Sequence, residues 1–165
     1  MAVAERVALT PVTTMDVGYK DSPAGDGAVQ IDSGATMATV HAWGGVTSCE
    51  AAVTTVNVLG AVWRHLGKTV GNIATLNLYP GAKFYNNSKL TTLTAVNLWP
   101  GAEYHASEDA DERTLTTVTL RGGASTVFDI ANGLNNQAVT NAIGVKGNPT
   151  ILCDDLRSLT FAAIP

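Results

Sequence analysis

A short phrase returns at nearly constant spacing in this sequence, and it limits the possible folds more than any other feature. Each copy has an apolar-polar-apolar triplet, then a turn that contains Gly followed by Ala, then a second alternating stretch. The four clearest triplets begin at Val56, Leu76, Val96 and Val118, so their spacings are 20, 20 and 22 residues. A fixed period of this length is the sequence signature of repeat architectures, in which similar units stack on one another.

The phrase has a simple mechanical interpretation. The triplet Leu76-Asn77-Leu78 alternates as a strand with one buried face does. In Tyr79-Pro80-Gly81-Ala82, Pro presets the first corner of a turn and Gly supplies the positive φ that the next corner needs. Positive φ is expected at three glycines, or at the residue beside each: Gly81, Gly101 and Gly123. Of the inward residues of the second strand, Phe84 and Tyr104 are expected to stack in one buried column, with Trp63 close to it.

Two weaker copies flank the four clear ones. They begin at Val29 and Ile143, at outer spacings of 27 and 25 residues. We therefore expect an all-β fold, a single-stranded, right-handed parallel β-helix of about six coils. A β-sandwich or β-barrel would give no reason for one phrase to recur at one phase. Residues 29–165 should form this solenoid with a C-terminal cap, and residues 1–28 an irregular N-terminal arm.

These copies resemble the parallel β-helix families over about residues 29–151, through the pattern apolar-x-apolar-x-x-Gly-Ala. The resemblance concerns the fold and carries no catalytic residues with it. Members include polysaccharide-degrading enzymes, ice-binding proteins, cell-scaffold proteins and phage fibre, spike and decoration proteins. The composition, rich in Ala, Gly, Thr and Val, is most similar to small phage virion proteins. This likeness implies a structural role in a bacteriophage virion, as a head decoration (cement) protein or a small fibre module.

Charge is scarce in this chain. Charged residues make up 15% of the 165 residues, against about 25% in typical domains, and the net charge is −4. The absence of a basic run argues against a nucleic-acid partner. The sequence shows no secretory signal and no apolar run long enough for a membrane span. A surface so poor in charge suits packing against neighbours, so we expect viral capsid or tail proteins as partners, and a homotrimer.

Two groups of residues are candidates for partner contact, and a third group is expected to form a polar ladder. The arm holds more apolar residues than a solvated tail needs, among them Val7, Leu9, Val12 and Tyr19. It is either a mobile tail or a segment that orders on a neighbouring subunit. The residue after each triplet should point outward at the corner, which gives the column Leu59, Tyr79, Trp99 and Arg121. Stacked apolar residues there, Tyr79 and Trp99 above all, would mark a contact surface. The polar centres of the triplets should form an outward ladder: Asn57, Asn77 and Asn97.

Catalytic, cofactor and metal sites are not expected. The acidic loop at residues 107–112 has oxygens for Ca²⁺ but lacks EF-hand spacing, so a solvated loop is favoured. Candidate catalytic carboxylates such as Glu103 and Asp129 stand in different columns, so the chain is not expected to be an enzyme. Cys49 and Cys153 are expected to be buried free thiols, with a disulfide left open. The alternatives are a carbohydrate-binding or carbohydrate-processing β-helix, or a scaffold or ice-binding solenoid.

Overall fold

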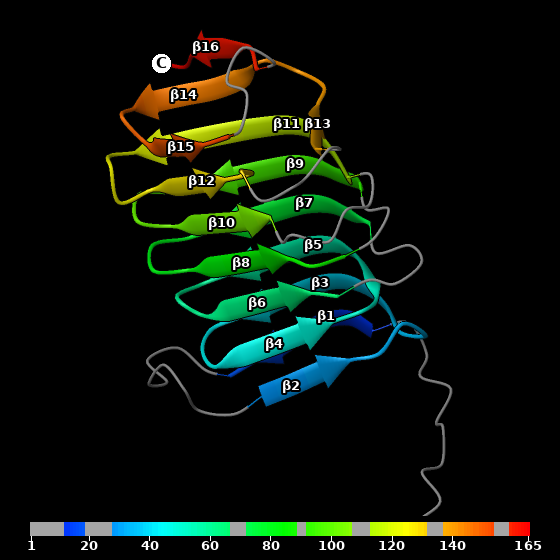
Figure 1. The fold of residues 1–165 in the computed structure, drawn as a ribbon. Helices are drawn as coiled ribbons and strands as arrows, with labels where there is room; N and C mark the ends of the chain where they lie inside the picture. Colours follow the sequence, from blue (N-terminus) through cyan, green and yellow to red (C-terminus); the bar gives the residue numbers. More distant parts are fainter. Residues whose placement is uncertain are drawn as a thin grey trace, which may run out of the picture.

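The computed structural model describes residues 12–18, 28–66, 72–88, 92–106, 113–131, 137–153 and 159–165. Within these ranges the chain forms strands and no helix, arranged in two sheets (Figure 1). The nine-stranded sheet contains β1 (Val12–Val17), β3 (Thr36–Ala42), β5 (Ala52–Val58), β7 (Ile73–Leu78), β9 (Thr92–Leu98), β11 (Arg113–Gly122), β13 (Gln137–Val139), β14 (Ile143–Gly147) and β16 (Phe161–Ala163). The seven-stranded sheet contains β2 (Ala28–Ile31), β4 (Val46–Cys49), β6 (Val62–His65), β8 (Lys83–Asn86), β10 (Glu103–Ala106), β12 (Val127–Asp129) and β15 (Thr150–Leu152).

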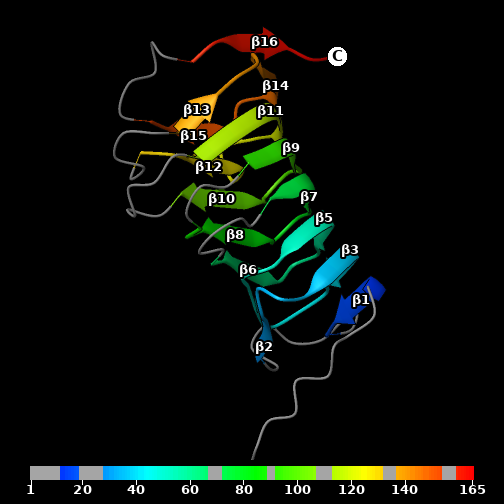
Figure 2. The ribbon, with the colours of Figure 1, turned by 90° about the vertical axis from the view of Figure 1, so that its right-hand side faces the viewer.

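The two sheets are the two walls of a parallel β-solenoid of about five turns, close to the six coils expected from the sequence. The chain alternates between the sheets, so that neighbours within a sheet come from successive coils and pair in parallel. In Figure 1 the front strands run to the right and the rear strands to the left while the chain climbs, which is a right-handed winding. Figure 2 shows the same stack from the side, with β1 and β2 at one end and β16 at the other.

The central repeat has the register that the triplets predict. Val56 pairs with Leu76, Leu76 with Val96, and Val96 with Val118. The C-terminal copy is also confirmed, because β14 pairs with β11 and places Gly144 opposite Thr119. The parallel pairing therefore keeps the triplets of successive coils aligned although the coils differ in length.

The prediction that a weaker copy of the repeat begins at Val29 is wrong. Val29 lies in β2 and pairs with Thr47 in the seven-stranded sheet, whereas the triplets lie in the nine-stranded sheet. The residue that pairs with Val56 is Val40, and Val40 in turn pairs with Met15 of β1. Alternation alone identifies a half-buried strand but does not say to which of two sheets that strand belongs.

The expected arm boundary at residue 28 also does not match the described structure. β1 lies inside residues 1–28, yet it forms the first strand of the nine-stranded sheet through parallel pairing with β3. Val17 is buried and joins the core, while Val12 is half-buried. Of the other proposed contact residues in this stretch, Val7, Leu9 and Tyr19 lie outside the described residues.

The core between the sheets is a set of stacked columns. Trp63, Phe84 and Tyr104 are fully buried in one column, as expected, and Phe128 extends it. The rings of Phe84 and Tyr104 stack with centroids 5.5 Å apart and an interplanar angle of 11°. The nine-stranded sheet contributes the facing aliphatic columns, which are fully buried in the central coils: Val56, Leu76, Val96, Val118, and Val58, Leu78, Leu98, Leu120.

Glycines with positive φ form the corners that follow the nine-stranded sheet. Gly81 and Gly101 have φ of 80°, as the turn predicts. In the next coil the positive φ belongs to Gly122, at 127°, and not to its neighbour Gly123. In that coil the positive φ thus lies at the residue beside Gly123, which the prediction allowed.

The C-terminal strand β16 extends the solenoid by one more strand and does not cover its end. β16 pairs in parallel with β14, so that Phe161 lies opposite Ile143 at the end of an inward column. Phe161 is 44% exposed because no further described strand pairs with β16, whereas Leu152 is 44% exposed because it pairs with Asp129 in an outward column. The expected C-terminal cap is therefore a last rung with apolar side chains at its surface.

Candidate interaction surface

The corner after each strand of the nine-stranded sheet carries a continuous column of large side chains, which we name the corner column. Its members are Trp43, Leu59, Tyr79, Trp99 and Arg121, and all are half-buried. Each directly follows the last inward residue of its strand, where the chain begins to turn toward the other sheet. The ladder extends into the corner, since the Trp99 amide donates to the Leu78 carbonyl at 2.9 Å. Corner side chains therefore stay in register and stack.

Aromatic stacking defines the middle of the corner column. The rings of Tyr79 and Trp99 are 4.8 Å apart and 14° from parallel. The Arg121 guanidinium lies 5.2 Å from the Trp99 ring centre, in cation–π range. Trp99 thus has Tyr79 on one face and Arg121 on the other, so the column presents ring edges outward. Such a strip suits contact with a protein surface, whereas stacking of a sugar ring requires an uncovered ring face.

A hollow of about 440 Å³ lies beside the end of the corner column. Its walls are Trp99, Pro100, Arg121, Gly122, Lys146, Gly147 and Pro165. Arg121 and Lys146 are directly paired across β11 and β14, which places two cationic side chains on adjacent coils. The hollow therefore joins an aromatic wall to a pair of positive charges.

The asparagine ladder is present as predicted. Asn77 Nδ2 donates to Asn57 Oδ1 at 2.8 Å, and Asn97 Nδ2 donates to Asn77 Oδ1 at 3.1 Å. His41 extends the ladder by one coil, since its Nδ1 lies 3.2 Å from Asn57 Nδ2. These bonds run along the solenoid axis, and each amide satisfies its neighbour in the next coil.

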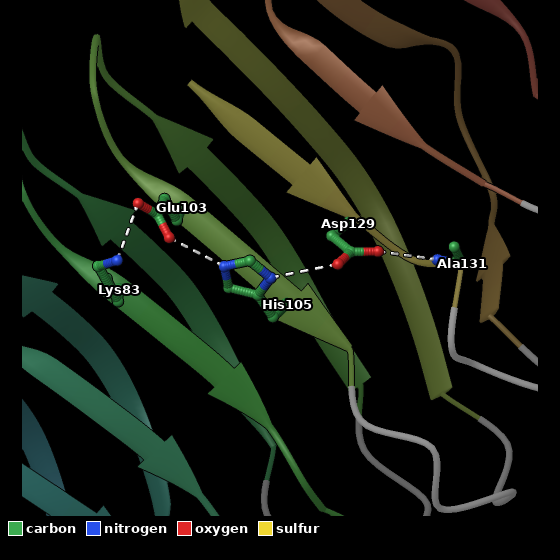
Figure 3. A network of polar contacts seen from close by, with 5 residues as sticks. All are labelled: Lys83, Glu103, His105, Asp129 and Ala131. Atoms are coloured by element: carbon green, nitrogen blue, oxygen red, sulfur yellow. Dashed lines mark hydrogen bonds and ion pairs between the residues drawn. The ribbon is translucent and has the colours of Figure 1, made fainter. Parts of the chain in front are cut away.

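A second polar feature lies on the outer face of the seven-stranded sheet (Figure 3). Lys83 Nζ is 3.1 Å from Glu103 Oε1, and Glu103 Oε2 is 3.0 Å from His105 Nε2. His105 Nδ1 lies 3.3 Å from Asp129 Oδ2, and Asp129 Oδ1 accepts a hydrogen bond from the Ala131 amide at 3.2 Å. A neutral imidazole can donate to only one of these carboxylates, whereas an imidazolium can donate to both.

Electrostatic coupling in this network shows in two pKa shifts. Desolvation by partial burial raises the pKa of the Glu103 carboxyl, but hydrogen bonds from His105 and Lys83 outweigh it and leave that pKa below its usual value. The hydrogen bond to Glu103 raises the pKa of the Lys83 ammonium. What Glu103 adds to stability is present at neutral pH and is lost as the pH falls through its lowered pKa. Lys83 and Glu103 are 44% and 26% exposed, so water screens the pair and its effect on stability is small.

The sequence missed this network although it had singled out its members. Glu103 and Asp129 do stand in different columns, since Glu103 pairs with Val127 and Asp129 with His105. His105 links the two columns through its two ring nitrogens. The acidic stretch at residues 107–112, which was weighed for Ca²⁺ binding, lies outside the described residues. Within the described ranges, no cluster of three or more His, Cys, Asp or Glu side chains is arranged to hold a metal ion.

The cysteines are both free. Cys49 is buried, and burial raises the pKa of its thiol to about 11, while Cys153 is half-buried. Two buried thiols were expected, so the prediction holds for Cys49 and overstates the burial of Cys153.

No protein family, curated protein or solved structure matches this chain. The described part contains no helix that could span a membrane. Of the proposed contact residues, the structure brings Tyr79 and Trp99 together in the corner column. Val12 lies in β1 at the far N-terminal end of the stack. The corner column is thus the best-formed candidate site for contact with another macromolecule.

Proposed function

We propose that the protein is a non-enzymatic structural component that docks on a larger assembly through the corner column. The observation that carries this proposal is the half-buried stack of Tyr79, Trp99 and Arg121. Aromatic residues and Arg are the types that most often dominate protein interfaces. Because they are held in place before binding, little side-chain entropy is lost when a partner covers them.

The assembly to which we assign the protein is a bacteriophage virion, where it would act as a head decoration (cement) protein or a small fibre module. Support comes from the resemblance of the repeat to phage structural solenoids and from the low charge of the chain. A compact stack with axial amide ladders offers a stiff body for such a role. Partners would be capsid or tail proteins, and neighbouring copies would pack as a homotrimer.

The test is co-sedimentation of the purified protein with particles isolated from its source. Trp99→Ser should weaken particle binding about tenfold or more, in line with the loss of an interface hot spot. Tyr85→Ser is the matched control, because Tyr85 is also a half-buried aromatic but lies on the outer face of the seven-stranded sheet. The docking role fails if the wild-type chain ignores the particles, or if both variants bind as the wild type does.

The oligomer and the arm need a separate test. Residues 1–11 precede β1, so their deletion removes Val7 and Leu9 but leaves the described strands intact. Light scattering of the full chain should give the mass of a trimer, and the truncated chain should remain folded yet attach poorly to particles. A monomeric full chain at micromolar concentration contradicts the trimer. Normal attachment of the truncated chain means that the arm is a tail without a docking role.

A second candidate function rests on the outer face of the nine-stranded sheet. Five threonines lie in one outward column that only Ala95 interrupts: Thr14, Thr39, Thr55, Thr75 and Thr117. Two residues further along each central strand runs the asparagine ladder, so hydroxyls and amides form a regular two-column array. A regular array of this kind favours contact with an ordered water lattice. The test is inhibition of ice growth by the wild type. Loss of inhibition in Thr75→Lys, with unchanged inhibition in Ser48→Lys on the opposite sheet, would establish this function. No inhibition by the wild type would exclude it.

A further inference from the structure

We propose that the hollow beside Arg121 and Lys146 is a binding site for a small oxyanion, namely a carboxylate, phosphate or sulfate group. The hollow shares Trp99 and Arg121 with the corner column, but the proposal goes beyond docking because it assigns a ligand class to the hollow. It rests on the pairing of two cations, on their lack of counter-ions and on the shape of the hollow.

The first step is the charge balance of the hollow. Arg121 and Lys146 lie opposite one another in neighbouring strands, a placement that is unfavourable for like charges. No described carboxylate forms an ion pair with either side chain, and the walls include no Asp or Glu. Elsewhere on the solenoid the comparable cation Lys83 has a partner, Glu103, at 3.1 Å. The two cations at the hollow thus have no ion-pair partner among the described residues.

The second step is the arrangement of the guanidinium. Arg121 lies over the Trp99 ring, whose other face is covered by Tyr79, so the stack holds the side chain in one orientation. Among the described residues the Arg121 guanidinium finds no hydrogen-bond acceptor, and its Nη1 is buried without one. The planar fork of Arg binds carboxylate and phosphate oxygens in pairs, and such charge-assisted bonds are the strong ones. The guanidinium is therefore held beside the hollow without an acceptor, and its nitrogens other than the covered Nη1 are the ones that can meet an oxyanion.

The third step is the shape of the hollow. Gly122 and Gly147 occupy two of its walls with φ of 127° and 87°, in the region where a side chain would be strained. A Cβ on Gly147 would also approach the Gly122 carbonyl oxygen far inside van der Waals contact. These two positions therefore require glycine, and the wall between the two cations is left without side chains. Pro100 and Pro165 close the remaining sides with apolar surface.

The test uses sulfate, phosphate and acetate at constant ionic strength, with chloride as the reference anion. Binding is followed by nuclear magnetic resonance at the Gly122 and Gly147 amides and the Trp99 indole. We expect saturable shifts at these groups, about tenfold weaker binding for Arg121→Gln, and a smaller loss for Arg121→Lys, which keeps the charge but not the fork. Lys146→Gln should weaken binding as well, whereas Lys83→Gln is the matched control and should bind as the wild type does.

The relative affinities separate the sources of the ligand group. Stronger binding of acetate would assign the site to carboxylates, such as an acidic side chain or an acidic sugar. Stronger binding of phosphate or sulfate would assign it to phosphate or sulfate esters. Shifts that rise linearly without saturation, or equal weakening by Arg121→Gln and Lys83→Gln, overturn the proposal. Arg121→Lys keeps a cation on the stack, so it still reports on the site if Arg121→Gln disturbs folding.

Discussion

Replacement of Phe84 by Ala tests the core and the register together. Phe84 is fully buried, and its ring stacks on Tyr104 at 5.5 Å and on His65 at 6.1 Å. Transfer of the lost ring carbons and the cavity left behind together cost about 3–5 kcal/mol for a buried Phe→Ala change. Loss of the aromatic stack falls toward the upper part of that range, because such pairs add about 0.5–1.5 kcal/mol beyond area burial. We expect a loss in unfolding free energy of about 4 kcal/mol.

Urea unfolding followed by tryptophan fluorescence measures this loss, since Trp63 is the residue paired with Phe84 in the adjacent coil. For a domain of this size the melting temperature should fall by about 8–16 °C. Tyr85→Ala is the matched control, because Tyr85 is the next residue but is half-buried and faces outward, and it should cost about 1 kcal/mol. A loss below 1 kcal/mol for Phe84→Ala, or equal losses for the two variants, would refute the inward placement of the second strand.

Further predictions concern the ladder, the corner, the thiols and the loops. Asn77→Ala should cost about 1–3 kcal/mol in urea unfolding, because it leaves an amide unpaired in each neighbouring coil. Gly101→Val should destabilise the protein more than Gly101→Asn does. The φ of Gly101 is 80° and the space around its Cβ position is open, so the two variants differ mainly in how well Val and Asn tolerate left-handed backbone. Equal losses of stability would contradict this. With a Cys49 pKa of about 11, only about one thiol in a thousand is ionised at pH 8, so Cys153 should react first with a thiol reagent. Two residues inserted at 89–91 should leave the melting temperature nearly unchanged, whereas the same insertion between Pro80 and Gly81 should lower it by several degrees.

The sequence predicted the central coils because their triplets share one phase. Val56, Leu76 and Val96 follow one another at equal spacing, and the parallel ladder converts equal spacing directly into stacked columns. It failed at the N-terminus because the coil from Val40 to Val56 has 16 residues and lacks the insertion that lengthens the others. The triplet of that coil, Val40-His41-Ala42, also has His where the next three triplets have Asn. Val29-Gln30-Ile31 looks more like the central copies although it belongs to the other sheet.

The corner column could be predicted, but the His105 network could not. Tyr79 and Trp99 each follow the last inward residue of a triplet, so their alignment depends only on the repeat. His105 and Asp129 are 24 positions apart, and their pairing depends on how much chain the following loop takes up. The copy at Ile143 already aligns Lys146 with Arg121, but the hollow was missed because its shape also depends on Gly147 and Pro165, which lie outside the triplets.

The two corners of each coil obey different length rules, and this difference explains where the candidate sites lie. Corners that lead from the nine-stranded to the seven-stranded sheet have three or four residues in the central coils, at 59–61, 79–82 and 99–102. Connections that lead back range from two residues at 50–51 to eight at 153–160. A side chain can stack along the whole axis only where every coil places it at the same height, so a continuous strip forms at the constant corner. Insertions accumulate at the other corner because they change the length of a coil without changing the register of its strands. The corner column and the oxyanion hollow both lie on the constant side, where residues of successive coils can be selected together for one surface.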